Sequence, residues 1–157
     1  MKKILPIVFI FLFLACNNSG NSGIHSSDDG TKAQKSHSDS LMNEVMEGHN
    51  IGMAKMSKLN ETKNKIQQVL DSISKLPTHL QKSFTQYKME LDSTFNRLTF
   101  ANYAMDKWME EFNMDSAAND EEKRIEYLES EKTKISKVNE AMISSLQKAD
   151  SLLKKKF

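Results

Sequence analysis

Residues 66–80, IQQVLDSISKLPTHL, contain the feature that decides the fold, a helical seam that stops at a proline. Apolar residues recur every three or four positions up to Leu76, which is typical of an amphipathic helix. Pro77 has no backbone N–H and cannot continue that helix, whereas Thr78 can cap a new one. The sequence therefore predicts two helices joined by a tight turn at Pro77.

Upstream of the proline, the first helix is expected over residues 41–76. Ser38, Asp39 or Ser40 can cap its start. Downstream, a second helix is expected over 79–113 and a third over 119–155, with Asn119 or Asp120 as the cap of the third. The third helix has the most regular seam, formed by Ile125, Leu128, Ile135, Val138, Met142, Leu146, Ala149 and Leu152.

Three amphipathic helices with short connections can bury their apolar stripes only against one another, with sequential neighbours antiparallel. No alternating run rich in Val, Ile and Thr is present, so no strand is expected. The sequence thus predicts an all-α fold, an antiparallel up-down-up three-helix bundle spanning residues 41–157. A long coiled coil that dimerises is the alternative, but the breaks at Pro77 and 113–119 favour a monomeric domain.

The N-terminal segment predicts a lipoprotein signal peptide over residues 1–15. Lys2 and Lys3 precede an apolar run, Ile4–Ala15, that is too short to span a bilayer as a helix. The run ends on the one cysteine of the chain, Cys16, which we expect to be acylated, with chains such as palmitate holding the protein to a membrane. Residues 16–40 are polar and predict a lipidated cysteine followed by a disordered, flexible tether.

The charge composition of the chain restricts the classes of partner that it is expected to bind. Without Lys2 and Lys3 the chain has 20 basic and 21 acidic residues, so its net charge is near −1. A nucleic-acid-binding domain would need a basic face, and no nucleic acid is expected as a partner. The expected partners are the membrane and an envelope protein, and the expected location is the outer membrane, facing the periplasm.

Three blocks carry a resemblance to a known group. They are Val45-Met46-x-x-His49-Asn50-x-x-Met53-x-Lys55-Met56, then Ala101-Asn102-x-Ala104-Met105-x-x-Trp108-Met109-x-x-Phe112, then Tyr127-Leu128-x-x-Glu131-x-x-Lys134-Ile135-x-x-Val138. Together they resemble short Bacteroidota lipoproteins often labelled "viral A-type inclusion protein". Asn50 and Asn102 stand where aspartate is common in that group. The resemblance implies a helical, membrane-tethered protein and implies no activity.

A methionine-rich cluster surrounds two glycines of the first helix. Its members are Met46, His49, Met53, Met56, Met105, Trp108 and Met109. Gly48 and Gly52 are four residues apart and open one strip of that helix, which we expect to face the ring of Trp108 or Tyr127. His49 is expected to pair with Glu131, because that carboxylate interrupts the apolar seam of the third helix.

Three interpretations of this cluster stay open. Core packing is favoured, because methionine fills gaps in helical cores. A docking surface for a partner is the second. A Cu(I) site is the third, since thioether and imidazole ligands suit that ion. No catalytic motif is present, so the sequence predicts a non-catalytic binding or scaffold lipoprotein without a cofactor, and a periplasmic Cu(I)-binding lipoprotein is the alternative.

Overall fold

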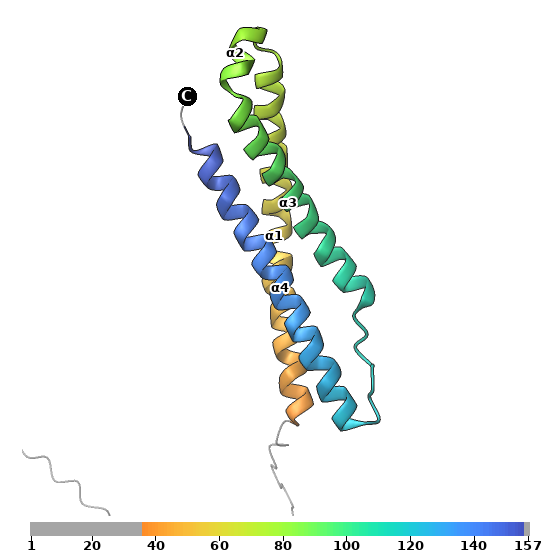
Figure 1. The fold of residues 1–157 in the computed structure, drawn as a ribbon. Helices are drawn as coiled ribbons and strands as arrows, with labels where there is room; N and C mark the ends of the chain where they lie inside the picture. Colours follow the sequence, from red (N-terminus) through yellow and green to blue (C-terminus); the bar gives the residue numbers. More distant parts are fainter. Residues whose placement is uncertain (1–35, 156–157) are drawn as a thin grey trace, which may run out of the picture. The chain divides into compact units, whose positions relative to one another are not determined.

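The computed structural model describes residues 36–155, which form four helices that pack together (Figure 1). They are α1 (His37–Ser74), α2 (Thr78–Ser83), α3 (Thr85–Glu111) and α4 (Glu121–Leu153). Residues 36–155 contain no strand, and the prediction of an all-α fold is confirmed. The predicted signal peptide, Cys16 and most of the predicted tether lie outside the described residues.

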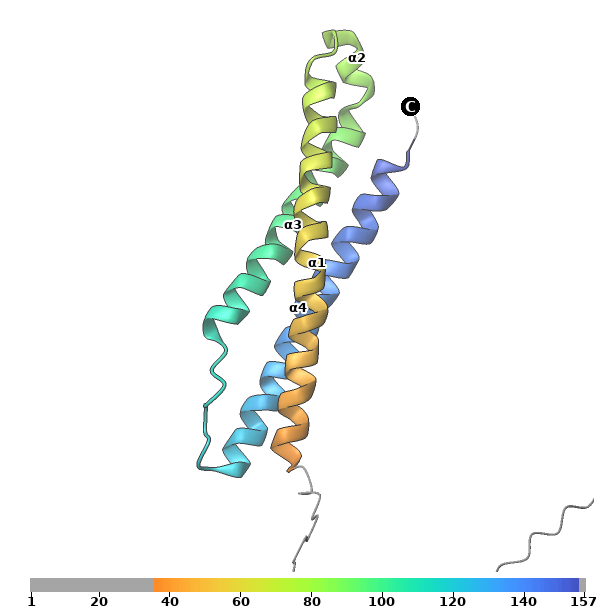
Figure 2. The ribbon, with the colours of Figure 1, turned by 180° about the vertical axis from the view of Figure 1, so that it is seen from behind.

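The core lies between the three long helices. Each of α1, α3 and α4 contacts the other two, and Figures 1 and 2 show them side by side from opposite directions. Fully burying one leucine-sized side chain stabilises a fold by roughly 1.5–3 kcal/mol, so the interior leucines and isoleucines supply most of the packing energy. The largest fully buried apolar residues are Val45, Leu59, Ile66, Leu91, Leu98, Met105, Leu128, Ile135, Met142 and Leu152.

The first helix begins earlier than the sequence analysis predicted. Ser36 caps α1, and its hydroxyl accepts a hydrogen bond from the backbone N–H of Asp39 at 3.1 Å. The Asp39 carboxylate accepts from the backbone N–H of Ser36 in return, which completes a capping box. Ser38, one of the expected caps, is buried instead and donates its hydroxyl to Glu121 Oε2 at 3.0 Å.

The segment predicted as one helix over 79–113 is two helices, so the expectation of three helices is corrected to four. Phe84 separates α2 from α3, with φ −99° and ψ 3°, outside the helical region. The six-residue α2 forms part of the turn after Pro77. Gln81 fixes that turn, because its Nε2 donates to the carbonyl oxygens of Ser74 and Leu76 at 3.0 and 2.7 Å. These bonds satisfy carbonyl groups that the end of α1 leaves without helical partners.

Residues 112–120 connect α3 to α4 without a helix. The backbone N–H of Asn113 donates to Tyr127 Oη at 2.7 Å. Arg124 Nη1 donates to the carbonyl oxygens of Met114 and Ser116, at 3.2 and 3.1 Å. Ala117 adopts a positive φ of 54°, which lets the chain turn towards α4. Three hydrogen bonds with the side chains of Tyr127 and Arg124 on α4 therefore hold this connection in place.

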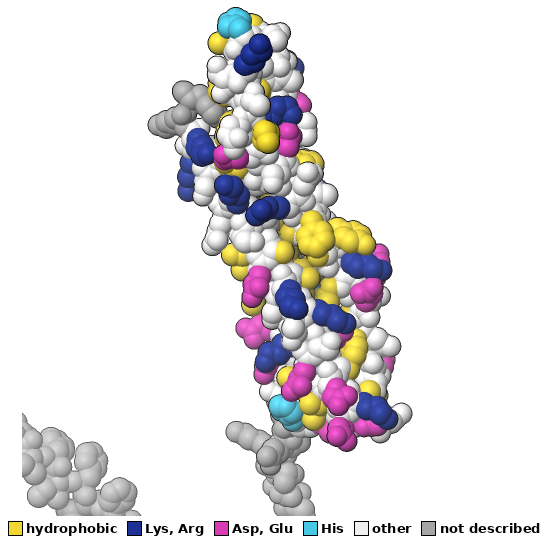
Figure 3. Space-filling model, in the orientation of Figure 1, with side chains coloured by type: hydrophobic (Ala, Val, Ile, Leu, Met, Phe, Trp, Pro, Cys, Tyr) yellow, Lys and Arg dark blue, Asp and Glu magenta, His cyan; other side chains and the backbone are white. Residues whose placement is uncertain are grey.

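The surface carries charges of both signs and some exposed apolar groups. Figure 3 shows acidic and basic side chains interspersed, with hydrophobic side chains gathered midway along this face over α3. Phe100 and Tyr103 of α3 are 62% and 58% exposed. Within residues 36–155, no helix combines the length and the apolar character that crossing a membrane requires.

Candidate functional site

An open hollow of about 230 Å³ brings together parts of the predicted methionine cluster. Its walls come from α1, α3 and the connection 112–120. The lining residues are Met46, His49, Trp108, Met109, Phe112 and Met114. Three thioethers, one imidazole and two aromatic rings from three separate segments therefore share one surface cavity.

Trp108 is the fixed wall of this hollow. The indole is 5% exposed, and its Nε1–H donates to Glu131 Oε2 at 2.9 Å. The other carboxylate oxygen of Glu131 accepts from Lys134 Nζ at 2.7 Å, so a 3% exposed charge has two partners. This hydrogen bond raises the pKa of Lys134 above its usual value. Phe112 stacks on Trp108 with ring centroids 4.9 Å apart, which orders the apolar wall of the hollow.

His49 lies beside the same indole but does not pair with Glu131. Its ring centroid is 5.9 Å from that of Trp108, and its Nδ1 is 3.2 Å from Asn50 Oδ1. The predicted pair between His49 and Glu131 is wrong, because the carboxylate is occupied by Trp108 and Lys134. When Nδ1 carries the proton, it donates to Asn50 Oδ1 and Nε2 has the lone pair.

The structure divides the predicted cluster into two environments. Met105 is fully buried in the core, and Met56 is half-buried and packs against the core away from the hollow. Met53 is 41% exposed and does not line the hollow either. Core packing therefore accounts for Met105. Met46, His49 and Met109 are half-buried and line the open hollow, and Met109 also packs against the core.

Two lining residues were not among the predicted site residues. Phe112 is the last residue of the α3 seam, and Met114 follows it in the connection. Their spacing gave no direct signal, because Met114 lies beyond the helix and its position depends on how 112–120 folds. The density of methionine over residues 105–114 is the signal that could have included Met114.

The glycine strip faces different residues from those predicted. A Cβ on Gly48 would lie 2.9 Å from Ile135 Cγ2, and a Cβ on Gly52 would lie 2.0 Å from Met105 Cε. The expectation that Trp108 or Tyr127 fills the strip is therefore wrong. The glycines let α1 approach α4 and let the flexible end of Met105 enter from α3, because a thioether chain fills irregular gaps.

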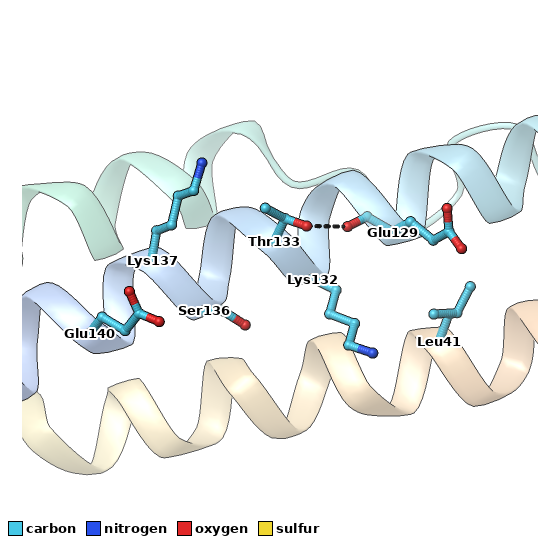
Figure 4. A pocket seen from close by; sticks show the side chains of 7 residues that line it. All are labelled: Leu41, Glu129, Lys132, Thr133, Ser136, Lys137 and Glu140. Carbon is cyan, nitrogen blue, oxygen red and sulfur yellow. Dashed lines mark hydrogen bonds between the residues drawn. The ribbon is translucent and has the colours of Figure 1, made fainter.

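A larger hollow, about 550 Å³, lies between α1 and α4. Figure 4 shows its lining side chains, which are Leu41, Glu129, Lys132, Thr133, Ser136, Lys137 and Glu140. Lys132 reaches across to pair with Glu44 of α1, and the Thr133 hydroxyl donates to the carbonyl oxygen of Glu129 at 3.0 Å. These contacts are those of a solvated interhelical groove, and the methionine-lined hollow is the stronger candidate site.

Within residues 36–155, no three His, Cys, Asp or Glu side chains are grouped so that they could hold a metal ion. The donors at the methionine-lined hollow are of another kind, thioether sulfurs and one imidazole. Comparison of the chain with protein-family models, with curated proteins and with solved structures finds no match.

Proposed function

We propose that this chain is an envelope lipoprotein whose helical domain is a non-catalytic binding module. The methionine-lined hollow is its binding surface, and an envelope protein is its partner. The observation that carries the proposal is the gathering of Met46, Met109 and Met114 around one open cavity. Thioether side chains are flexible and polarizable, so they suit adaptable recognition surfaces.

The lining of the hollow favours binding over catalysis. It offers one imidazole, and it has no carboxylate or hydroxyl side chain within the lining set that could act with that imidazole. Glu131, the nearest buried carboxylate, is held by Trp108 and Lys134 and supports the wall. General acid–base or nucleophilic chemistry needs a second group in hydrogen-bond reach of the first.

The tether is the second part of the proposal. The apolar segment that ends at Cys16 supports acylation of that cysteine, in keeping with the resemblance to short Bacteroidota lipoproteins. The proposed location is the outer membrane, facing the periplasm. The α1 helix starts near residue 36, and the hollow begins within three turns of that start, at Met46. The module would act as a monomeric up-down-up bundle of the three long helices, with α2 in the turn.

Fractionation of cells tests the tether. The wild-type chain is expected in the membrane fraction in a processed form, and Cys16→Ser is expected to accumulate as unprocessed precursor. Cys16→Ser protein that is processed and membrane-bound like the wild type would overturn the lipoprotein assignment.

In-cell photocrosslinking tests the binding surface. A photoreactive amino acid replaces Met114, which is 53% exposed at the rim of the hollow. The control position is Leu80, which is 42% exposed on α2 in the turn after Pro77. We expect one recurrent envelope protein crosslinked from position 114 and absent from position 80. No crosslink at position 114, or the same products from both positions, would contradict docking at the hollow.

A further inference from the structure

The donor atoms around the hollow are all soft or borderline. Met46, Met109 and Met114, which carry thioether sulfurs, and His49, which carries an imidazole, line the hollow. Thioethers select Cu(I) over the hard cations Mg²⁺ and Ca²⁺, which require oxygen ligands, and imidazole also suits copper. No carboxylate stands in the lining set, so a divalent cation would gain no charge neutralisation there.

The geometry of His49 suits coordination through one defined atom. In the tautomer that donates from Nδ1 to Asn50 Oδ1, the lone pair is on Nε2. Metal-binding histidines commonly donate their second ring N–H to a carbonyl or carboxylate oxygen in this way, which fixes the tautomer. Met46 precedes His49 by three residues on α1, so the two side chains lie on one face of the helix.

The wall opposite α1 is formed by α3 and the connection 112–120, and it supplies Met109, Trp108 and Met114. Met109 follows Trp108, whose indole is anchored by Glu131. The faces of aromatic rings attract cations, and the Trp108 ring lines the same cavity. Met114 lies on the connection that Arg124 holds through the carbonyl oxygens of Met114 and Ser116.

We infer that the hollow binds one Cu(I) ion through Met46 Sδ, Met109 Sδ and His49 Nε2, with Met114 at the rim as an additional ligand. Binding forms coordinate bonds and changes no oxidation state. This inference rests on the proposed function, because it names a ligand for the same binding surface. A docked envelope protein would then be a donor or acceptor of that ion.

The test is an anaerobic Cu(I) titration of the full chain in detergent, against a chromogenic Cu(I) chelator. The chain carries Cys16→Ser, because a free thiol would itself bind Cu(I). Trp108 is the one tryptophan of the sequence, so its fluorescence reports on the site. We expect one equivalent to bind in competition with the chelator and to quench this fluorescence.

Single substitutions identify the ligands. Met46→Leu, Met109→Leu and His49→Ala are each expected to weaken Cu(I) affinity at least tenfold. Met53→Leu is the matched control, because Met53 is on α1 and outside the hollow, and its affinity should equal that of the parent chain. Far-ultraviolet circular dichroism of every variant checks that helix content is unchanged.

A second readout detects direct coordination. With ¹³C-methyl-labelled methionine, addition of the redox-inert Ag(I) should shift the methyl signals of Met46 and Met109 and leave that of Met89 in place. Absence of competitive Cu(I) binding, or binding that the triple Met46/His49/Met109 variant retains, would overturn the inference. If Cu(I) fails to bind while position 114 still crosslinks, only the metal inference fails. If Cu(I) binds without a crosslink, docking fails instead.

Discussion

The side-chain amide of Asn139 on α4 donates a hydrogen bond to the backbone carbonyl oxygen of Gly48 on α1, with an N–O distance of 2.8 Å. The two residues are 91 positions apart in sequence. The contact is possible because Gly48 and Gly52 have no side chains to keep α4 away. Polar groups in a helical interface can set the register of two helices, and this pair fixes α1 against α4.

Replacing Asn139 with aspartate should destabilise the protein. The change keeps the shape but removes the Nδ2–H donor and sets a carboxylate oxygen against the Gly48 carbonyl. We expect the free energy of unfolding, measured in urea, to fall by about 1–3 kcal/mol. The matched control is Asn96→Asp at an exposed position of α3, which should stay close to wild type. Equal stability of the two variants would show that the Asn139 contact has no energetic role.

Gly52→Ala should destabilise the protein, because overpacking costs more free energy than the higher helix propensity of alanine gains. Alanine gains about 1 kcal/mol over glycine in a helix, whereas overpacking typically costs about 1–3 kcal/mol. The new Cβ would lie 2.0 Å from Met105 Cε and 2.7 Å from Asn139 Oδ1. Met105 is fully buried and Asn139 is held by its hydrogen bond to Gly48, so neither side chain has room to move aside and a net loss is expected. Met105→Leu removes the Cε atom and should restore part of the lost stability in a double-mutant cycle. A Gly52→Ala variant more stable than wild type would contradict this packing.

Stability should fall at alkaline pH through three groups. Hydrogen bonds to Glu131 and Glu111 raise the pKa values of Lys134 and Lys107, and burial raises the pKa of Tyr87. A group whose pKa is raised on folding stabilises the fold fully below its unfolded pKa, about 10 for these groups. That contribution is lost as pH rises through the higher folded pKa. Urea unfolding from pH 8.5 to 11.5 should show the decline.

Lys134→Arg separates the contribution of Lys134 to this alkaline loss from the others. Arginine stays protonated throughout the range, so the variant should lose less stability than wild type between pH 10 and 11.5. The residual decline then belongs to Lys107 and to Tyr87, whose hydroxyl donates to the carbonyl oxygen of Leu152 at 3.1 Å. An unchanged profile for Lys134→Arg would show that its pair with Glu131 does not contribute.

Removing the Arg124 side chain should loosen the rim of the hollow. Arg124→Ala loses both bonds to the connection 112–120. The methyl signal of Met114 in methionine-labelled protein is expected to shift and sharpen, whereas that of the distant Met142 stays unchanged. Arg97→Ala, an exposed arginine of α3, is the control and should leave both signals in place. If Arg124→Ala leaves the Met114 signal unchanged, the Arg124 hydrogen bonds do not hold Met114 in place.

The periodic seams and Pro77 predicted the helical fold, because helix formation and helix ending depend on local residue types. The capping box of Ser36 and Asp39 was also readable as an S-x-x-D pattern, but it was missed in favour of later serines. The break at Phe84 carried no signal. No glycine or proline stands there, and Phe84 packs against the core, so we attribute the break to tertiary packing.

The sequence placed His49 and Trp108 in the same cluster, but it did not predict which faces of the helices meet. His49 does lie near Trp108, another member of the predicted cluster, whereas Gly52 faces Met105 and not the expected aromatic ring. Which face of α1 meets α4 depends on the mutual rotation of two helices, and that is set by packing of distant residues. The sequence pattern therefore assigned Glu131 to His49, whereas rotation brings that carboxylate to Trp108.

The most direct test of the central claim is solvent access to the methionine methyl groups in the full chain. A soluble paramagnetic agent enhances the relaxation of ¹³C-methyl signals in proportion to their exposure. We expect strong enhancement for Met46, Met109 and Met114, which line the open hollow, and little for the fully buried Met105 and Met142. Protection of Met46 and Met109 equal to that of Met105 would contradict the account, because the cluster would then be core and no binding hollow would exist.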